Sequence, residues 1–131
     1  GIISYWINTW KKKKKLNYIG FGGNGYQVRD CLHPLDLCIL VKKQISFIHR
    51  KKLNSFIFNV SGGIPSSFSL KELSMWCKKN ILPKKIGYEK KTRLFDLKWI
   101  VLDSTKAKKI FKWKIKFSKY NIFQDVNLND N

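Results

Sequence analysis

Acidic side chains, cysteines and long apolar runs are all scarce in this sequence. Eight Asp and Glu residues stand against 27 Lys and Arg, which gives a formal net charge of +19. No segment approaches the ~18 consecutive apolar residues of a membrane-spanning helix. The chain also begins without an initiator Met and without the basic and then apolar segments of a signal peptide. We therefore expect a cytoplasmic protein that does not bind a membrane, and a chain that is a piece of a longer one.

Cysteine and histidine are too few, and too unfavourably spaced, for a metal site. The three cysteines (Cys31, Cys38 and Cys77) form no C-x-x-C pair, and His33 and His49 match no zinc-ligand spacing. An odd number of cysteines without pairing is typical of a reducing compartment. Cys38 and Cys77 lie within apolar helical patterns, so we expect both side chains to be buried.

Catalytic sequence motifs are also missing. The chain has no G-x-S-x-G elbow and no P-loop, and no Tyr is followed four positions later by Lys. Gly20, Gly22 and Gly25 do match G-x-G-x-x-G, but the glycines of a dinucleotide loop must open a helix. Residues 26–32 are strand-like instead, and no acidic residue lies ~20 positions further on to bind a ribose. We therefore predict no catalytic and no cofactor-binding residue in this chain.

The net positive charge is large, but it is weaker evidence for a function than its size suggests. Of the 27 basic residues 24 are Lys, while Ala occurs once, a composition typical of an AT-biased coding sequence. Such a field still attracts polyanions, so a small basic module that binds nucleic acid non-specifically stays open as an alternative function. The rare arginines, among them Arg29 and Arg93, carry more information because a guanidinium offers a planar fork that Lys lacks.

Apolar periodicity and turn signals predict an α/β region that spans residues 1–131 as a single unit. The predicted helices begin near residues 2, 34, 69 and 104, and the predicted strands cover 16–21, 26–32, 55–60, 84–88 and 97–102. The Asn24-Gly25 step predicts a tight hairpin between the first two strands. The pattern fades after residue 118, so we expect a poorly defined end over 118–131.

Three of the predicted helices carry local signals at their ends. Ser69 and Glu72 form the S-x-x-E pattern of a capping box. Pro34 suits the first turn of a helix, which is then expected to bury one apolar face through about residue 48, where the basic stretch 49–52 closes it. Further along the chain, Asp103 or Ser104 is expected to cap the short helix that begins near residue 104.

Residues 23–37 form the most informative cluster. They resemble the G-x-G-x-Q-x-R-D-x-x-H-x-x-D-L segment of the extended short-chain dehydrogenase/reductase family, the NAD-dependent nucleotide-sugar epimerases and dehydratases. Three more stretches resemble that family in the same order: F-N-V-S-G-G at 58–63, S-F-S-L-K-E-L at 67–73, and R-x-x-D, D-x-x-K-A and Trp within 93–113. Ser61 and Lys112 depart from the pattern, because the family usually has glycine at both places.

The resemblance implies an α/β fold, namely the C-terminal substrate-binding portion of an extended Rossmann-type nucleotide-sugar epimerase. It implies that NAD serves the complete enzyme and is bound by an N-terminal half that is absent here, together with the Tyr-x-x-x-Lys pair. The chain alone is then expected to be inactive. Its implied partner is a nucleotide-diphosphate sugar rather than a specific nucleic acid, and a homo-oligomer of the complete enzyme stays open. Residues 18–23 and 67–73 are most similar to 2-epimerases, with 4-epimerases and 4,6-dehydratases as alternatives.

The resemblance also implies roles for individual residues. Arg29 and Arg93 match the family arginines that bind the substrate's diphosphate. The segment 17–21 would flank the nucleotide base, and Gln27 is a further candidate for substrate contact. Asn59 is another such candidate, although it could equally be a structural residue.

Overall fold

The computed structural model describes residues 1–48 and 57–129. The basic stretch 49–52, which includes Arg50, and the first two residues of the predicted strand 55–60 lie outside the described residues. The contacts divide the chain into two compact units rather than one. The first unit contains Gly1–Arg29, Phe68–Ile100 and Phe123–Asn131, and the second contains Asp30–Ser67 and Val101–Ile122.

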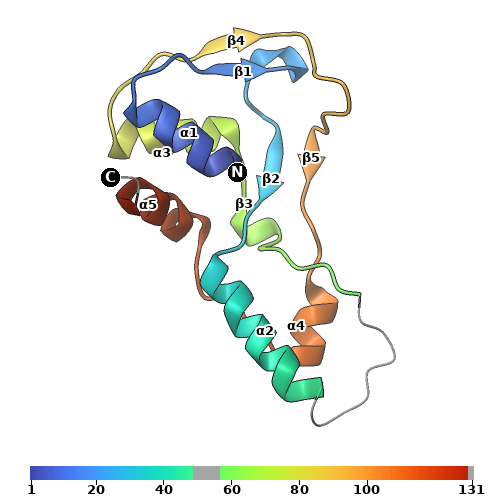
Figure 1. The fold of residues 1–131 in the computed structure, drawn as a ribbon. Coiled ribbons are helices and arrows are strands. Elements are labelled where there is room, and N and C mark those ends of the chain that lie inside the picture. The colour runs from blue at the N-terminus through green and yellow to red at the C-terminus, as the bar shows by residue number, and fades with distance from the viewer. Residues whose placement is uncertain (49–56, 130–131) are drawn as a thin grey trace. The chain divides into compact units, whose positions relative to one another are not determined.

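Short strands form two sheets (Figure 1). Strand β1 (Asn17–Ile19) pairs in parallel with β4 (Gly87–Glu89), so that Tyr18 lies opposite Tyr88. Strand β2 (Val28–Asp30) pairs in parallel with β5 (Trp99–Ile100). The second sheet has the order β3-β2-β5, in which β3 is Ser67–Ser69. Each predicted strand before residue 50 or after residue 80 is therefore confirmed, although each is shorter than predicted.

Two helices, α1 (Ile2–Lys11) and α3 (Leu70–Asn80), lie side by side in the first unit (Figure 1). Their contact is held by buried indoles, because Trp6 Nε1 donates to Ser74 Oγ at 3.0 Å. Trp10 Nε1 likewise donates to the Leu82 carbonyl at 2.9 Å. A buried Trp whose N–H is satisfied contributes apolar area without an unpaired donor. Helix α1 is thus the amphipathic helix that the sequence predicts.

The predicted capping box begins α3. The Glu72 N–H donates to Ser69 Oγ at 3.1 Å, and the Ser69 N–H donates to Glu72 Oε2 at 2.7 Å. Two backbone donors that the first helical turn would leave unpaired are therefore satisfied within the motif.

The second unit is built around α2 (Pro34–Ile48) and α4 (Thr105–Phe111), which pack on each other (Figure 1). Its 3-10 turn, η2, covers Ile64–Ser66. The Asp36 carboxylate is fully buried and accepts hydrogen bonds from the N–H groups of Lys116 and Phe117, at 3.0 and 3.1 Å. The buried core of the unit consists of Leu40, Ala107, Phe111 and Trp113.

The predicted hairpin at Asn24-Gly25 is wrong. Strands β1 and β2 belong to different sheets, and a short 3-10 turn, η1 (Phe21–Gly23), lies between them. Gly25 has a φ of +71°, and a Cβ there would lie 2.5 Å from the Tyr18 ring. The glycines therefore allow a tight turn against β1 rather than a return along it.

The predicted burial of Cys38 is also wrong, whereas that of Cys77 is confirmed. Leu40 faces the core of the second unit, and Cys38 is two positions away, about 200° around the helix. The predicted apolar face of this helix is also wrong in part, since Val41 and Ile45, which the apolar pattern places on it, are exposed.

Two further predictions, one for a strand and one for the C-terminal segment, are corrected by the structure. Residues 57–60 form no strand in the part of the chain that the structure describes, and a strand requires a hydrogen-bonded neighbour. A poorly defined end was predicted over 118–131, but Lys119–Asn129 form a helix, α5. Their burial explains this, because Phe123 packs edge-on against Phe68 and Trp76.

Both predicted caps of α4 take part, in different ways. Asp103 Oδ1 accepts from the Thr105 N–H at 2.8 Å and so satisfies a donor of the first turn. Ser104 stands at the N-cap position, but its hydroxyl instead exchanges hydrogen bonds with the backbone of Ser61. The carboxylate is therefore the capping group, and the serine joins two segments of the second unit.

Candidate functional site

A cavity of about 580 Å³ lies within the first unit. Its volume is in the range of sites that bind small molecules and cofactors. Helix α1, β1 and the start of α3 contribute an apolar part of its wall, which includes Tyr5 and Ile19. The polar side chains that line it are Lys15, Asn17, Gln27, Arg29, Arg93 and Asp96.

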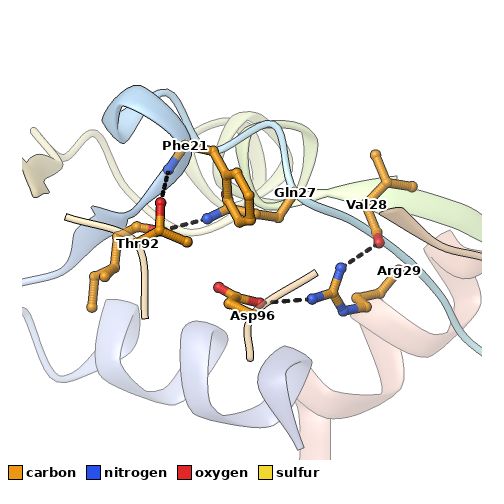
Figure 2. Close-up of polar contacts among 7 residues, drawn as sticks. Phe21, Gln27, Val28, Arg29, Thr92 and Asp96 are labelled. Atoms are coloured by element: carbon orange, nitrogen blue, oxygen red, sulfur yellow. Dashed lines mark hydrogen bonds and ion pairs between the residues drawn. The ribbon is translucent and has the colours of Figure 1, made fainter. Parts of the chain in front are cut away.

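Arg29 reaches the cavity from strand β2. Its backbone is fixed by the parallel pairing of β2 with β5, in which Arg29 lies opposite Ile100. Its guanidinium donates to the Val28 carbonyl at 2.7 Å and to Asp96 Oδ1 at 3.0 Å (Figure 2). A guanidinium has five N–H donors. Arg29 is therefore held in position with donors left for a ligand.

Arg93 and Asp96 reach the same cavity from one turn. The Asp96 N–H donates to the Arg93 carbonyl at 3.2 Å, which closes the turn. Just before it, Thr92 Oγ1 accepts from the Phe21 N–H at 3.1 Å and fastens the segment to η1 (Figure 2). The Arg93 side chain is exposed and makes no ion pair with any residue that the structure describes. It is thus a free guanidinium at the cavity.

Gln27 lies just before β2 and is 7% exposed. Its Nε2 donates to the carbonyl of Ile19 on β1. Its Oε1 has no hydrogen-bond partner among the described residues, and neither has Oδ1 of Asn17. Asn17 Oδ1 is packed against Gly87 of β4, where a Cβ would meet it.

The charge of the cavity suits an anion. Lys15, Arg29 and Arg93 supply three cations, and Asp96 supplies a single carboxylate. The Arg29–Asp96 pair is partly open to water, with side-chain exposures of 30% and 24%. Two arginines that converge on one cavity are the usual arrangement for bidentate binding of phosphate.

Three of the four predicted site residues, Gln27, Arg29 and Arg93, line this cavity. Asn59 does not line it; Asn59 is exposed and belongs to the second unit. Sequence reasoning missed the contribution of Lys15, because it lies in a lysine run that is typical of a solvated helix end.

Asp96 was also missed as a lining residue. It lies within the R-x-x-D stretch that the sequence already singled out, so its spacing from Arg93 was the available signal. The carboxylate of Asp30, which neighbours Arg29 in sequence, instead accepts from the N–H groups of Gly63 and Leu102. The partner of Arg29 is therefore the distant acid rather than the adjacent one.

Two of the three thiols, those of Cys31 and Cys77, are not poised for chemistry. Burial raises the pKa of Cys77 to about 12. Burial also raises the pKa of Cys31 to about 11, and the charge of Asp30 adds to the shift. Both thiols are therefore neutral near pH 7, whereas a nucleophile or metal ligand must be a thiolate.

Two kinds of site feature can be looked for among the described residues: a cluster of metal ligands, and a glycine loop that opens a helix. No cluster of three or more His, Cys, Asp or Glu residues that could hold a metal occurs in the part of the chain the structure describes. The Gly20–Gly25 segment leads through η1 into strand β2, so no helix N-terminus is available there for a pyrophosphate. Among the same residues, no helix is long and apolar enough to cross a bilayer.

The fold and the cavity together define a class of protein, in which an α/β unit places two arginines at one ligand-sized cavity. Solved structures of nucleotide-sugar enzymes share this fold. A UDP-glucose 4-epimerase from Thermotoga maritima, solved with UDP-glucose, is 22% identical and has a TM-score of 0.71 over 98% of this chain and 37% of its own. A dTDP-glucose 4,6-dehydratase from Bacillus anthracis, in complex with NAD, is 21% identical, with a TM-score of 0.71 over 97% of this chain and 38% of its own.

A third similar structure is a UDP-glucose 4-epimerase from Bifidobacterium longum in complex with NAD+ and UDP. It is 22% identical and has a TM-score of 0.70, over 97% of this chain and 38% of its own. The chain thus spans well under half the length of these enzymes. No family model and no curated protein matches the sequence. The predicted fold class, the α/β fold of extended Rossmann-type epimerases, is confirmed by these likenesses.

Proposed function

We propose that this chain is the nucleotide-sugar-binding portion of an NAD-dependent nucleotide-sugar epimerase or dehydratase. The observation that carries the proposal is the convergence of Arg29 and Arg93 on one cavity in a fold shared with enzymes solved with UDP-glucose and UDP. In this proposal the two guanidinium groups bind the diphosphate of the substrate, and Gln27 contacts the substrate beside them. Asn59 stays a separate proposal as a substrate contact, since it does not line this cavity.

The finer proposal is a CDP-paratose 2-epimerase-like activity. Its support is the sequence resemblance of residues 18–23 and 67–73 to that enzyme. Such an enzyme oxidises a sugar carbon transiently and returns the hydride to the opposite face. A 4-epimerase or a 4,6-dehydratase is the alternative, which the names of the similar structures favour.

NAD belongs to the proposed complete enzyme, as it does to two of the similar structures. When bound, NAD supplies the hydride acceptor and donor. The glycine segment 20–25 leads into a strand rather than a helix, so we assign NAD binding and the proton-transfer Tyr to another part of the enzyme. The share of this chain is orientation: by holding the diphosphate, it fixes where the sugar lies.

Titration of the 131-residue chain with UDP, measured by calorimetry, tests the proposal. Replacing Arg29 or Arg93 by Lys keeps the charge but removes the second hydrogen bond of the fork. A charge-assisted bond contributes about 1.5–3 kcal/mol, so each variant should bind UDP roughly 10- to 150-fold more weakly. The third arginine provides the matched control, since Arg50→Lys should leave UDP affinity unchanged.

Two results would contradict the proposal. One is the absence of UDP and CDP binding by the wild-type chain. The other is equal behaviour of Arg29→Lys and Arg50→Lys in the presence of native-like circular dichroism. Comparing CDP, UDP and dTDP in the same titration would rank the three nucleotide classes, and a preference for CDP would support the 2-epimerase assignment.

A further inference from the structure

Arg93 reaches the cavity from a segment that forms neither helix nor strand. This segment, residues 90–98, lies between β4 and β5. The guanidinium of Arg29 is held by hydrogen bonds to the Val28 carbonyl and to Asp96, whereas that of Arg93 makes no ion pair with any residue that the structure describes. The position of the Arg93 side chain therefore depends on the backbone that carries it.

Thr92, the residue before Arg93, fastens the segment to η1 (Figure 2). Beyond the last pair of the β1–β4 ladder, the Gly20 N–H donates to the Glu89 carbonyl at 2.7 Å. The next N–H along the chain, that of Phe21, donates to Thr92 Oγ1 at 3.1 Å. A side-chain hydroxyl thus continues the hydrogen bonding between the two segments past the end of the sheet.

The two segments approach closely because Gly20 has no side chain. A Cβ on Gly20 would lie 2.9 Å from Thr92 Cα and 3.2 Å from Thr92 Oγ1. Gly20 also has a φ of +76°, in the left-handed region that favours glycine. On the other side of Arg93, the Asp96 N–H donates to the Arg93 carbonyl at 3.2 Å. The backbone at Arg93 is therefore held at two points, and Thr92 is the first of them.

The hydroxyl is the part of Thr92 that can have this effect. Thr92 is exposed, so its side chain contributes little buried area. A phosphate bound through two parallel N–H bonds requires a fixed orientation of the guanidinium. If the turn moves, only the fraction of molecules that have the turn in place can bind, and the apparent affinity falls by that fraction.

We propose that Thr92 is a positioning residue, whose hydroxyl holds the backbone at Arg93 so that its guanidinium meets the diphosphate of the ligand. This inference rests on the diphosphate site of the proposed function. It adds to that site a residue that acts on the ligand only through Arg93.

Calorimetric titration of Thr92 variants with UDP tests the inference. Thr92→Val removes the hydroxyl and nearly keeps the shape, and it should bind UDP roughly 2- to 12-fold more weakly, because the loss cannot exceed the contribution of one hydrogen bond. Thr92→Ser keeps the hydroxyl and should stay within about twofold of the wild-type chain. Thr105→Val is the matched control. Thr105 is also exposed and donates to Asp103 Oδ1 at 2.6 Å, but neither residue lines the cavity, so UDP affinity should not change.

Two comparisons separate positioning from a merely structural role. In an Arg93→Ala background, Thr92→Val should change UDP affinity by less than about twofold, because the group that Thr92 positions is gone. With Arg93 present, Thr92→Val should weaken UDP and pyrophosphate by the same factor, since Arg93 binds the part that both ligands share. Thermal unfolding followed by circular dichroism verifies that the compared chains are folded.

Several outcomes would overturn the inference. If Thr92→Val binds UDP like the wild-type chain while Arg93→Lys weakens binding, the diphosphate site stands and the positioning role fails. If the loss persists in Arg93→Ala, if Thr92→Ser loses as much as Thr92→Val, or if Thr92→Val does not fold, the hydroxyl does not act through Arg93. If UDP alone is weakened, Thr92 acts on the nucleoside instead. If the wild-type chain binds neither ligand, the proposed function fails and the inference fails with it.

Discussion

At the residue scale, Phe95 lies in sequence between Arg93 and Asp96, which both line the candidate site. Its backbone has a conformation that a bulky side chain disfavours. Its φ is +63°, in the left-handed region, and its side chain is 92% exposed. Bulky residues rarely adopt a positive φ, and such strain is often found beside functional groups. Here the strained residue belongs to the turn that directs Arg93 and Asp96 into the cavity.

Replacing Phe95 by Gly should stabilise the protein. Glycine adopts a positive φ without steric cost, and the exposed ring loses no buried area, so we expect the free energy of unfolding to rise by about 1 kcal/mol. Denaturation by urea measures the change. Leu94→Gly is the control, because Leu94 is 83% exposed without a positive φ, and this variant should lower stability by about 0.5–1 kcal/mol. Equal changes in the two variants would refute the role of backbone strain.

The Arg29–Asp96 pair is a second feature at this scale. Because both side chains are partly open to water, the pair contributes at most about 1 kcal/mol to stability. The pair is better explained by its position at the cavity than by a contribution to stability. Asp96 orients the guanidinium of Arg29, which the proposed function assigns to a phosphate.

At the element scale, α3 is the helix whose start is defined most fully by its own sequence. Ser69 and Glu72 satisfy each other's backbone N–H groups, and the helix then places Leu73 and Cys77 in the core of the first unit. The element also supplies Leu70 to the wall of the cavity. The cap therefore contributes to the position of the candidate site as well as to the helix.

Ser69→Ala should lower the free energy of unfolding by about 1 kcal/mol, because the Glu72 N–H loses its acceptor at the N-cap. Thermal or chemical denaturation provides the measurement. Ser46→Ala in α2 is the matched control: the Ser46 hydroxyl donates back to the Lys42 carbonyl within the helix, and its loss should be neutral or slightly stabilising. A control variant as unstable as Ser69→Ala would show that the capping box is unimportant.

At the scale of the whole molecule, the net charge of +19 acts on any polyanion. Most of it comes from dispersed lysines, and two arginines are concentrated at one cavity. Substituting the two arginines should therefore weaken nucleotide binding more than polyanion binding. Raising the salt concentration should weaken polyanion binding more than nucleotide binding. This difference separates the proposed function from the nucleic-acid alternative.

Binding of the chain to double-stranded DNA should be independent of base sequence and should fall by roughly a thousandfold between 50 and 200 mM salt, as expected for several phosphate contacts. Fluorescence anisotropy with two duplexes of unrelated sequence measures both properties. Sequence-selective binding that persists at 150 mM salt would favour the nucleic-acid module over the nucleotide-sugar site.

Local structure was predictable from the sequence by itself. The periodicity of α1, the capping box of α3 and the proline that begins α2 act within a few residues, so their effect does not depend on the rest of the fold. The two arginines could be singled out for the same kind of reason, since their side-chain chemistry differs from that of the surrounding lysines.

Tertiary structure alone decided the remaining features. Asn24-Gly25 does not form a hairpin, because β1 pairs with β4 and β2 with β5, each some 70 residues further along the chain, instead of with each other. Cys38 is exposed because the core lies on the other side of α2. Gln27, Arg29 and Arg93 meet in one cavity because parallel pairing of β2 with β5 brings distant segments together. Pairing and burial depend on contacts between distant residues, which a local pattern does not contain.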